Sequence, residues 1–203
     1  MNYRHLINMT LIAFLFILSG IMSVIWNGDQ SPTMLKVIMS NLIDIPQAAS
    51  KMDSPPQQYF YFGHFTLLFY AAVFFNIHNL KKAIPSRIVY VSSLLLSIAF
   101  CADIGTYWLS EIYGVNFRTI VFWYIEFPAL VLLLIYWIAL ASYQTIKAKK
   151  LHKMVYLLPL SATASGVIQY LPHSLLLAIL CVVSFEYFTL TPYSNNNTSK
   201  VNT

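Results

Sequence analysis

The sequence predicts an all-α protein, a polytopic transmembrane helix bundle with about six membrane-spanning helices. The first observation is composition, because 58% of the 203 residues are hydrophobic and only 9% are charged. The mean hydropathy of +0.64 lies well above the usual balance of a soluble domain. The second is a series of six long apolar segments, and the third is the clustering of basic residues in alternate connections between them.

The six segments are expected at residues 6–26, 60–80, 88–109, 119–143, 154–171 and 174–190. A helix needs about 20 apolar residues to cross a bilayer's hydrocarbon, and these segments are close to that length. Only Pro172 and His173 separate the last two, and a continuous helix would be too long, so a tight hairpin is expected. A cleaved signal peptide is the alternative for the first segment. Its length and lack of an Ala-x-Ala site favour an anchor.

The distribution of basic residues predicts the orientation of the bundle in the membrane. Most basic residues fall before the first segment and in the second and fourth connections: Arg4, Lys81, Lys82, Arg87, Lys147, Lys149, Lys150 and Lys153. Such residues concentrate in cytoplasmic loops, so both termini are expected in the cytoplasm, with a bacterial inner membrane as the host. The net charge of +5 therefore indicates topology rather than nucleic-acid binding. We expect one transmembrane domain at 1–191 and a short disordered cytoplasmic tail at 192–203.

The only long connection, 27–59, follows the first segment on the outer side. Within 32–45, Thr33, Lys36, Ser40 and Asp44 recur at helical spacing and apolar residues occupy the opposite face. This pattern predicts a short amphipathic helix in the outer membrane interface. Surface anchoring and a gating lid over the bundle are both compatible with it.

Three ionisable residues, His64, Asp103 and Glu126, lie in predicted spans at similar distances from the outer boundary. Their depths are roughly 6 to 11 Å at about 1.5 Å per helical residue, so they are expected in one layer. Such residues are costly in a membrane helix and usually face the bundle interior. Pro128 also removes a backbone hydrogen bond to the carbonyl of Tyr124, which leaves an acceptor near Glu126.

The predicted layer has further polar and aromatic members. Tyr107 shares a polar helical face with Asp103, Gln169 lies near the outer end of the fifth segment, and Trp123 borders the layer. Together these residues predict an outward-facing polar pocket for a small amphiphilic or cationic ligand. The alternative is that the same groups only hydrogen-bond one another and hold the helices together.

The leading functional hypothesis is a multi-pass membrane protein that binds a small ligand, moves a solute or transfers protons. One alternative is an intramembrane lipid-modifying enzyme, with Asp103 or Glu126 as general base and His64 as acid. Another is a non-catalytic accessory subunit that binds a membrane-protein partner. The sequence leaves enzymatic activity open and favours a non-enzyme, since it has no Gly-x-Ser-x-Gly elbow.

No cofactor or metal is expected. His64 and His78 share a helical face at a spacing suited to two haems, but the other histidines lie at segment ends or in loops. No span contains the lysine that retinal would need. Cys101 and Cys181 lack Cys-x-x-Cys spacing and are expected to be packing residues. Glu186, close to the inner boundary, is expected to snorkel to the cytoplasmic interface.

Overall fold

The computed structural model describes residues 3–25, 56–81, 84–114, 117, 120–148 and 171–190. In these residues the chain forms five α-helices and one π-helix, with no strand. The α-helices are α1 (Tyr3–Ile25), α4 (Pro56–Leu80), α5 (Ser86–Tyr113), α7 (Phe127–Ala148) and α9 (Leu171–Leu190), and the π-helix is η2 (Phe122–Glu126). The all-α prediction is therefore confirmed for the described part of the chain.

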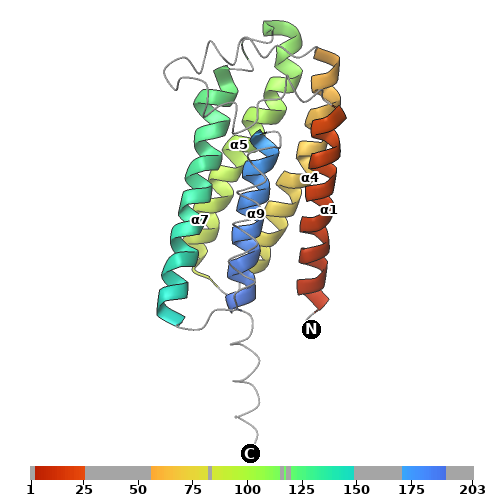
Figure 1. Cartoon of the computed structure of the whole chain (residues 1–203). Coiled ribbons are helices and arrows are strands. Elements are labelled where there is room, and N and C mark those ends of the chain that lie inside the picture. Colours follow the sequence, from red (N-terminus) through yellow and green to blue (C-terminus); the bar gives the residue numbers. More distant parts are fainter. Residues whose placement is uncertain are drawn as a thin grey trace, which may run out of the picture.

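The helices run side by side along one common axis (Figure 1). In this view α1 and α5 run upward, and α4, α7 and α9 run downward. The start of α1 and the end of α9 consequently lie at the same end of the bundle. Helix α9 packs against α4, α7 and α1, and α5 packs against α4 and α7.

The helix boundaries follow local chemistry. Two helices begin close to prolines, α4 at Pro56 and α9 one residue before Pro172, where the missing proline N–H costs no intrahelical bond. Helix α5 begins at Ser86, directly after Pro85. The carbonyl of Pro85 accepts a hydrogen bond from the N–H of Ile88 at 3.0 Å. Gly114 follows the end of α5 with φ of +80°, a backbone conformation that suits glycine at a helix C-terminus.

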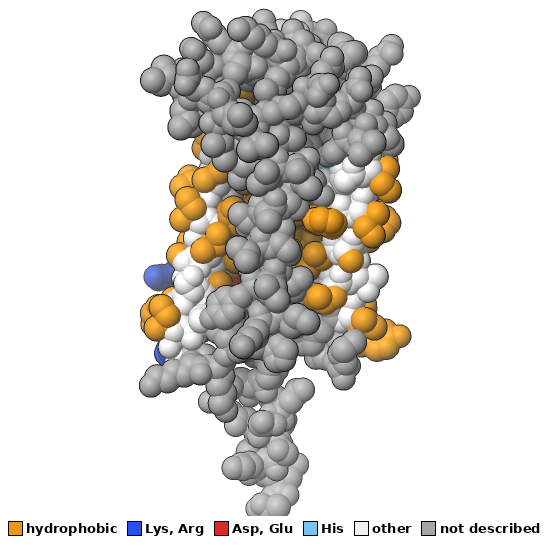
Figure 2. Space-filling model, in the orientation of Figure 1, with side chains coloured by type: hydrophobic (Ala, Val, Ile, Leu, Met, Phe, Trp, Pro, Cys, Tyr) orange, Lys and Arg blue, Asp and Glu red, His pale blue; other side chains and the backbone are white. Residues whose placement is uncertain are grey.

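Two stretches are long and apolar enough to cross a membrane, Ser86–Thr106 in α5 and Phe122–Lys147 across η2 and α7. Three shorter apolar stretches, Leu6–Ile21, Phe65–Leu80 and Pro172–Glu186, lie in α1, α4 and α9. Large apolar side chains remain exposed on the flanks of the bundle, such as Ile17 at 60% and Ile135 at 58%. Figure 2 shows such hydrophobic side chains over the sides of the molecule. An apolar flank of this kind indicates association with a membrane.

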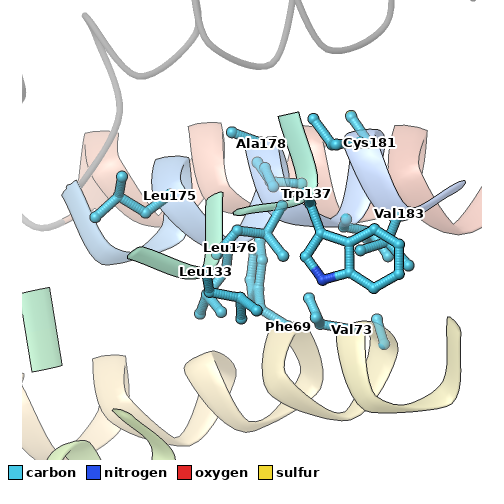
Figure 3. Packing of buried hydrophobic residues seen from close by; sticks show 14 of the residues in the cluster. Phe69, Val73, Leu133, Trp137, Leu175, Leu176, Ala178, Cys181 and Val183 are labelled. Carbon is cyan, nitrogen blue, oxygen red and sulfur yellow. The ribbon is translucent and has the colours of Figure 1, made fainter. Parts of the chain in front are cut away.

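The apolar core lies where α4, α7 and α9 meet. Trp137 of α7 has no exposed surface and packs beside Phe69 and Val73 of α4 and Leu176 and Val183 of α9 (Figure 3). Every side chain from position 172 to position 186 is buried, which makes α9 the central helix. Buried apolar side chains of α1 and α5, such as Leu15 and Leu96, belong to the same core, which holds together the helices that carry the polar sites below.

Several predicted elements lie outside the described residues. They are the amphipathic helix at 32–45, the fifth span apart from its last residue, and the tail at 192–203. The fourth predicted span, 119–143, begins about where the structure has a π-helix rather than an α-helix, and α7 continues beyond it to Ala148. The last span starts earlier than predicted, because α9 includes Pro172 and His173.

Candidate functional site

Asp103 lies on a buried stripe of α5. Buried side chains recur along this helix at intervals of three or four residues: Ser92, Leu96, Ala99, Asp103 and Thr106. This is the spacing of one helical face, and it turns the carboxyl group of Asp103 into the bundle. The Thr106 hydroxyl donates to the backbone carbonyls of Ala102 and Asp103, each at 2.8 Å. The Thr106 hydroxyl therefore finds its acceptors in the backbone of α5 and does not bind the Asp103 carboxylate.

Glu126 is the last residue of η2, and its side chain is only 2% exposed. The Phe127 N–H bonds the carbonyl of Phe122, five residues back, which is the hydrogen-bond pattern of a π-helix. Pro128 follows directly and has no N–H to continue an α-helical ladder. The wider turn rotates Glu126 inward while its neighbours Tyr124 and Ile125 stay exposed at 66% and 45%.

The two carboxyl groups are buried within range of one another's charge. Asp103 is close enough to Glu126 for their charges to interact, and both side chains are 2% exposed. The Tyr70 hydroxyl donates a hydrogen bond to Glu126 Oε1 at 3.3 Å. The Tyr70 ring packs edge-on against Phe100 of α5, with ring centroids 5.4 Å apart. We call Tyr70, Asp103 and Glu126, contributed by α4, α5 and η2, the carboxyl site.

Of the other predicted site residues, only Trp123 has a described side chain. Trp123 is partly buried and packs against the rings of Phe122 and Phe127, with centroids 5.0 and 5.2 Å apart. The backbone positions of His64 in α4 and Tyr107 in α5 are described, but their side chains are not. Gln169 lies outside the described residues. The structure thus brings Asp103 and Glu126 together, and the outward opening of a pocket remains a prediction.

Tyr70 was not among the predicted site residues. Tyr70 lies in the middle of an aromatic-rich segment, where hydropathy alone does not distinguish it from its neighbours. A signal was available, because Thr66, Tyr70 and Val73 recur at helical spacing and a buried tyrosine normally needs a hydrogen-bond partner. The structure shows that this partner is Glu126.

A second buried polar cluster centres on His173. Its Nδ1 lies 3.3 Å from Ser19 Oγ and its Nε2 lies 3.2 Å from Thr66 Oγ1, so one ring joins α1, α9 and α4. The ring also stacks on Phe69, with centroids 4.6 Å apart and planes 10° from parallel. The expectation that His173 lies in a turn is wrong. A proline is accepted in the first turn of a helix, so α9 begins before Pro172 and includes His173.

The prediction for Glu186 is also wrong, because its side chain is 2% exposed and does not snorkel to the surface. Helix α9 packs against α4, α7 and α1, and its side chains from position 172 to position 186 are all buried. Asn76 of α4 is buried as well, and its side-chain amide donates to the Ala72 carbonyl at 2.9 Å.

The described residues contain no group of three or more His, Cys, Asp or Glu side chains that could hold a metal ion. In the carboxyl site, two acids and one phenol supply oxygen atoms inside an apolar bundle. Oxygen atoms of this kind accept protons or contact small cations. Comparison with protein families, with curated proteins and with solved structures finds no match to this chain.

Proposed function

We propose that this chain is a multi-pass membrane protein whose six apolar segments each cross the bilayer, with both termini in the cytoplasm. Two stretches of sufficient length and the exposed apolar flanks support it. Helices α1 and α4 lie alongside them in the same bundle, and the start of α1 and the end of α9 lie at one end of it, which adds support (Figure 1). The basic connections give the orientation.

Reporter fusions test this topology. Fusions at Lys82, at Lys150 and at the C-terminus are expected to report the cytoplasm, and a fusion at Ser50 is expected to report the outer side. The reason is that Lys82 and Lys150 lie in the basic connections. An external C-terminus would contradict six spans and indicate five.

The function we propose for the carboxyl site is the binding and movement of a positive charge, either a proton or a small cationic solute. The observation that carries the proposal is the burial of Asp103 and Glu126 within range of one another's charge, with Tyr70 hydrogen-bonded to Glu126. Each carboxylate costs about 2.5 to 3.5 kcal/mol to place at the centre of a membrane helix on insertion scales. Two interacting carboxyl groups raise this cost further, because like charges repel. A bound proton or cation offsets both costs.

Tyr70 and η2 give this site its shape. The Tyr70 hydroxyl donates to Oε1 of Glu126 and so holds this carboxyl group in a fixed orientation. A π-turn next to a proline interrupts the regular hydrogen-bond ladder of the helix. Interruptions of this type recur at functional sites in membrane helices.

Charge-neutral variants test the function against a purely structural role. Asp103→Asn and Glu126→Gln keep the shape and much of the hydrogen-bonding capacity while they remove the charge. Both are expected to express and melt like the parent in detergent, yet fail to restore the phenotype of a deletion strain. Glu186→Gln is the matched control, since it neutralises another buried acid outside the carboxyl site. If both site variants restore the phenotype fully, the carboxyl site only holds helices together and the proposal fails.

A further inference from the structure

A basic groove lies at the other end of α4 and α5, where the two helices are joined. It is an open cavity of about 740 Å³. Three of its lining residues carry basic side chains, His78 and Lys81 from the end of α4 and Arg87 from the first turn of α5. All three are exposed, and the described residues that line the groove include no aspartate or glutamate.

The positive charge of this groove has no counterpart nearby among the described acids. Asp103, Glu126 and Glu186 are each only 2% exposed, so they lie within the bundle. Arginine and lysine side chains that share a concave surface without carboxylates attract anions, and the planar guanidinium group suits two oxygens of a phosphate.

The position of the groove narrows the class of anion. The apolar stretch of α4 ends at Leu80, beside Lys81, and the candidate span of α5 begins at Ser86, beside Arg87. The groove therefore lies where the apolar part of both helices stops, which is the level of lipid headgroups in a bilayer. Val89, Tyr90 and Val91 line its other side and lie within the apolar stretch, and Tyr90 is 70% exposed.

We propose that this groove binds the phosphate headgroup of an acidic phospholipid. Lys81 and Arg87 contact the phosphate, while Val89 and Val91 pack beside the first part of an acyl chain. The hydroxyl groups of Ser86 and Ser93 also line the groove and supply neutral donors for a glycerol-type headgroup. The site is independent of the carboxyl site and requires only that α5 spans the membrane.

The test measures lipid binding to the purified full-length protein in a neutral detergent. Native mass spectrometry follows titration with phosphatidylglycerol and, separately, with phosphatidylcholine that has the same acyl chains. The parent is expected to prefer phosphatidylglycerol. In Lys81→Gln/Arg87→Gln its affinity is expected to fall about 30-fold, since each basic residue near the headgroups contributes about one factor of five. Lys147→Gln, which removes an exposed lysine outside the groove, is the matched control and is expected to bind like the parent.

Three outcomes would overturn the proposal. The first is equal affinity of the parent for the two lipids. The second is an equal loss in Lys147→Gln, which would show a general charge effect. The third is full displacement of phosphatidylglycerol by millimolar inorganic phosphate, which would show that the groove binds the free anion instead. The Lys81→Arg/Arg87→Lys variant keeps both charges and is expected to retain the preference, so a loss of binding there would also count against it.

Discussion

The hydroxyl of Tyr70 donates a hydrogen bond to Oε1 of Glu126 at 3.3 Å, and both side chains are almost completely buried. This contact joins the middle of α4 to the π-turn that precedes α7. It also fixes the orientation of the Glu126 carboxyl group. The relationship explains why a tyrosine is present in a segment otherwise filled with apolar and aromatic residues.

Tyr70→Phe is expected to destabilise the protein by about 1 kcal/mol, because it leaves a buried carboxyl oxygen without its donor. The aromatic ring stays, so packing against Phe100 is preserved. Thermal unfolding in detergent measures the change. Tyr143→Phe, on the exposed surface of α7, is the control and is expected to leave the melting temperature unchanged. Identical melting of both variants would show that the hydrogen bond contributes nothing.

Substitutions of the two residues that contact His173, Ser19 and Thr66, are expected to have non-additive effects on the free energy of unfolding. Ser19→Ala and Thr66→Val each remove one partner of the same buried ring and are expected to cost about 1 to 3 kcal/mol. Their combination is expected to cost less than the sum, because both variants weaken the hold on one imidazole. A double-mutant cycle of unfolding free energies measures this coupling. Thr10→Ala, an exposed position on α1, is expected to have no effect. Strict additivity would contradict a shared role for the ring.

Substitution of the buried Trp137 is expected to lower the free energy of unfolding according to the side-chain volume that is lost, rather than the polarity. Trp137→Ala is expected to cost about 3 to 5 kcal/mol, because it opens a cavity among α4, α7 and α9. Trp137→Phe is expected to cost less than half as much, since it also removes an indole N–H that is buried without a hydrogen-bond partner. Leu132→Ala, on the exposed face of α7, is the control. Equal losses in the two Trp137 variants would show that the indole nitrogen is satisfied in solution.

The sequence predicts the helical class well because apolar runs of this length between charged connections have few other solutions. The sequence does not determine the local hydrogen-bond pattern of the helices. Pro128 indicates a missing backbone bond, but only the structure shows that the chain adapts with a π-turn at Phe122–Glu126. His173 was misplaced because hydropathy treats Pro172 as a break, whereas helix geometry accepts a proline in the first turn.

The candidate site was predictable in part. Counting residues from the outer boundary placed Asp103 and Glu126 at similar depths, and the structure shows them interacting. The rotation of each helix cannot be counted in the same way, so Tyr70 and the burial of Glu186 were missed. Helix rotation depends on packing against several neighbours at once, and a single sequence does not encode it in a local pattern.

The most direct test of the proposed function is flux through the purified protein in liposomes. A potassium gradient with valinomycin drives positive charge inward, and an entrapped pH dye reports protons. Parallel gradients of sodium and choline, with a dye for membrane potential, report small cations. We expect flux of at least one of these in the parent and in Glu186→Gln, and its loss in Asp103→Asn and Glu126→Gln. No flux in the parent above empty liposomes, or equal flux in the parent and the two site variants, would contradict the account.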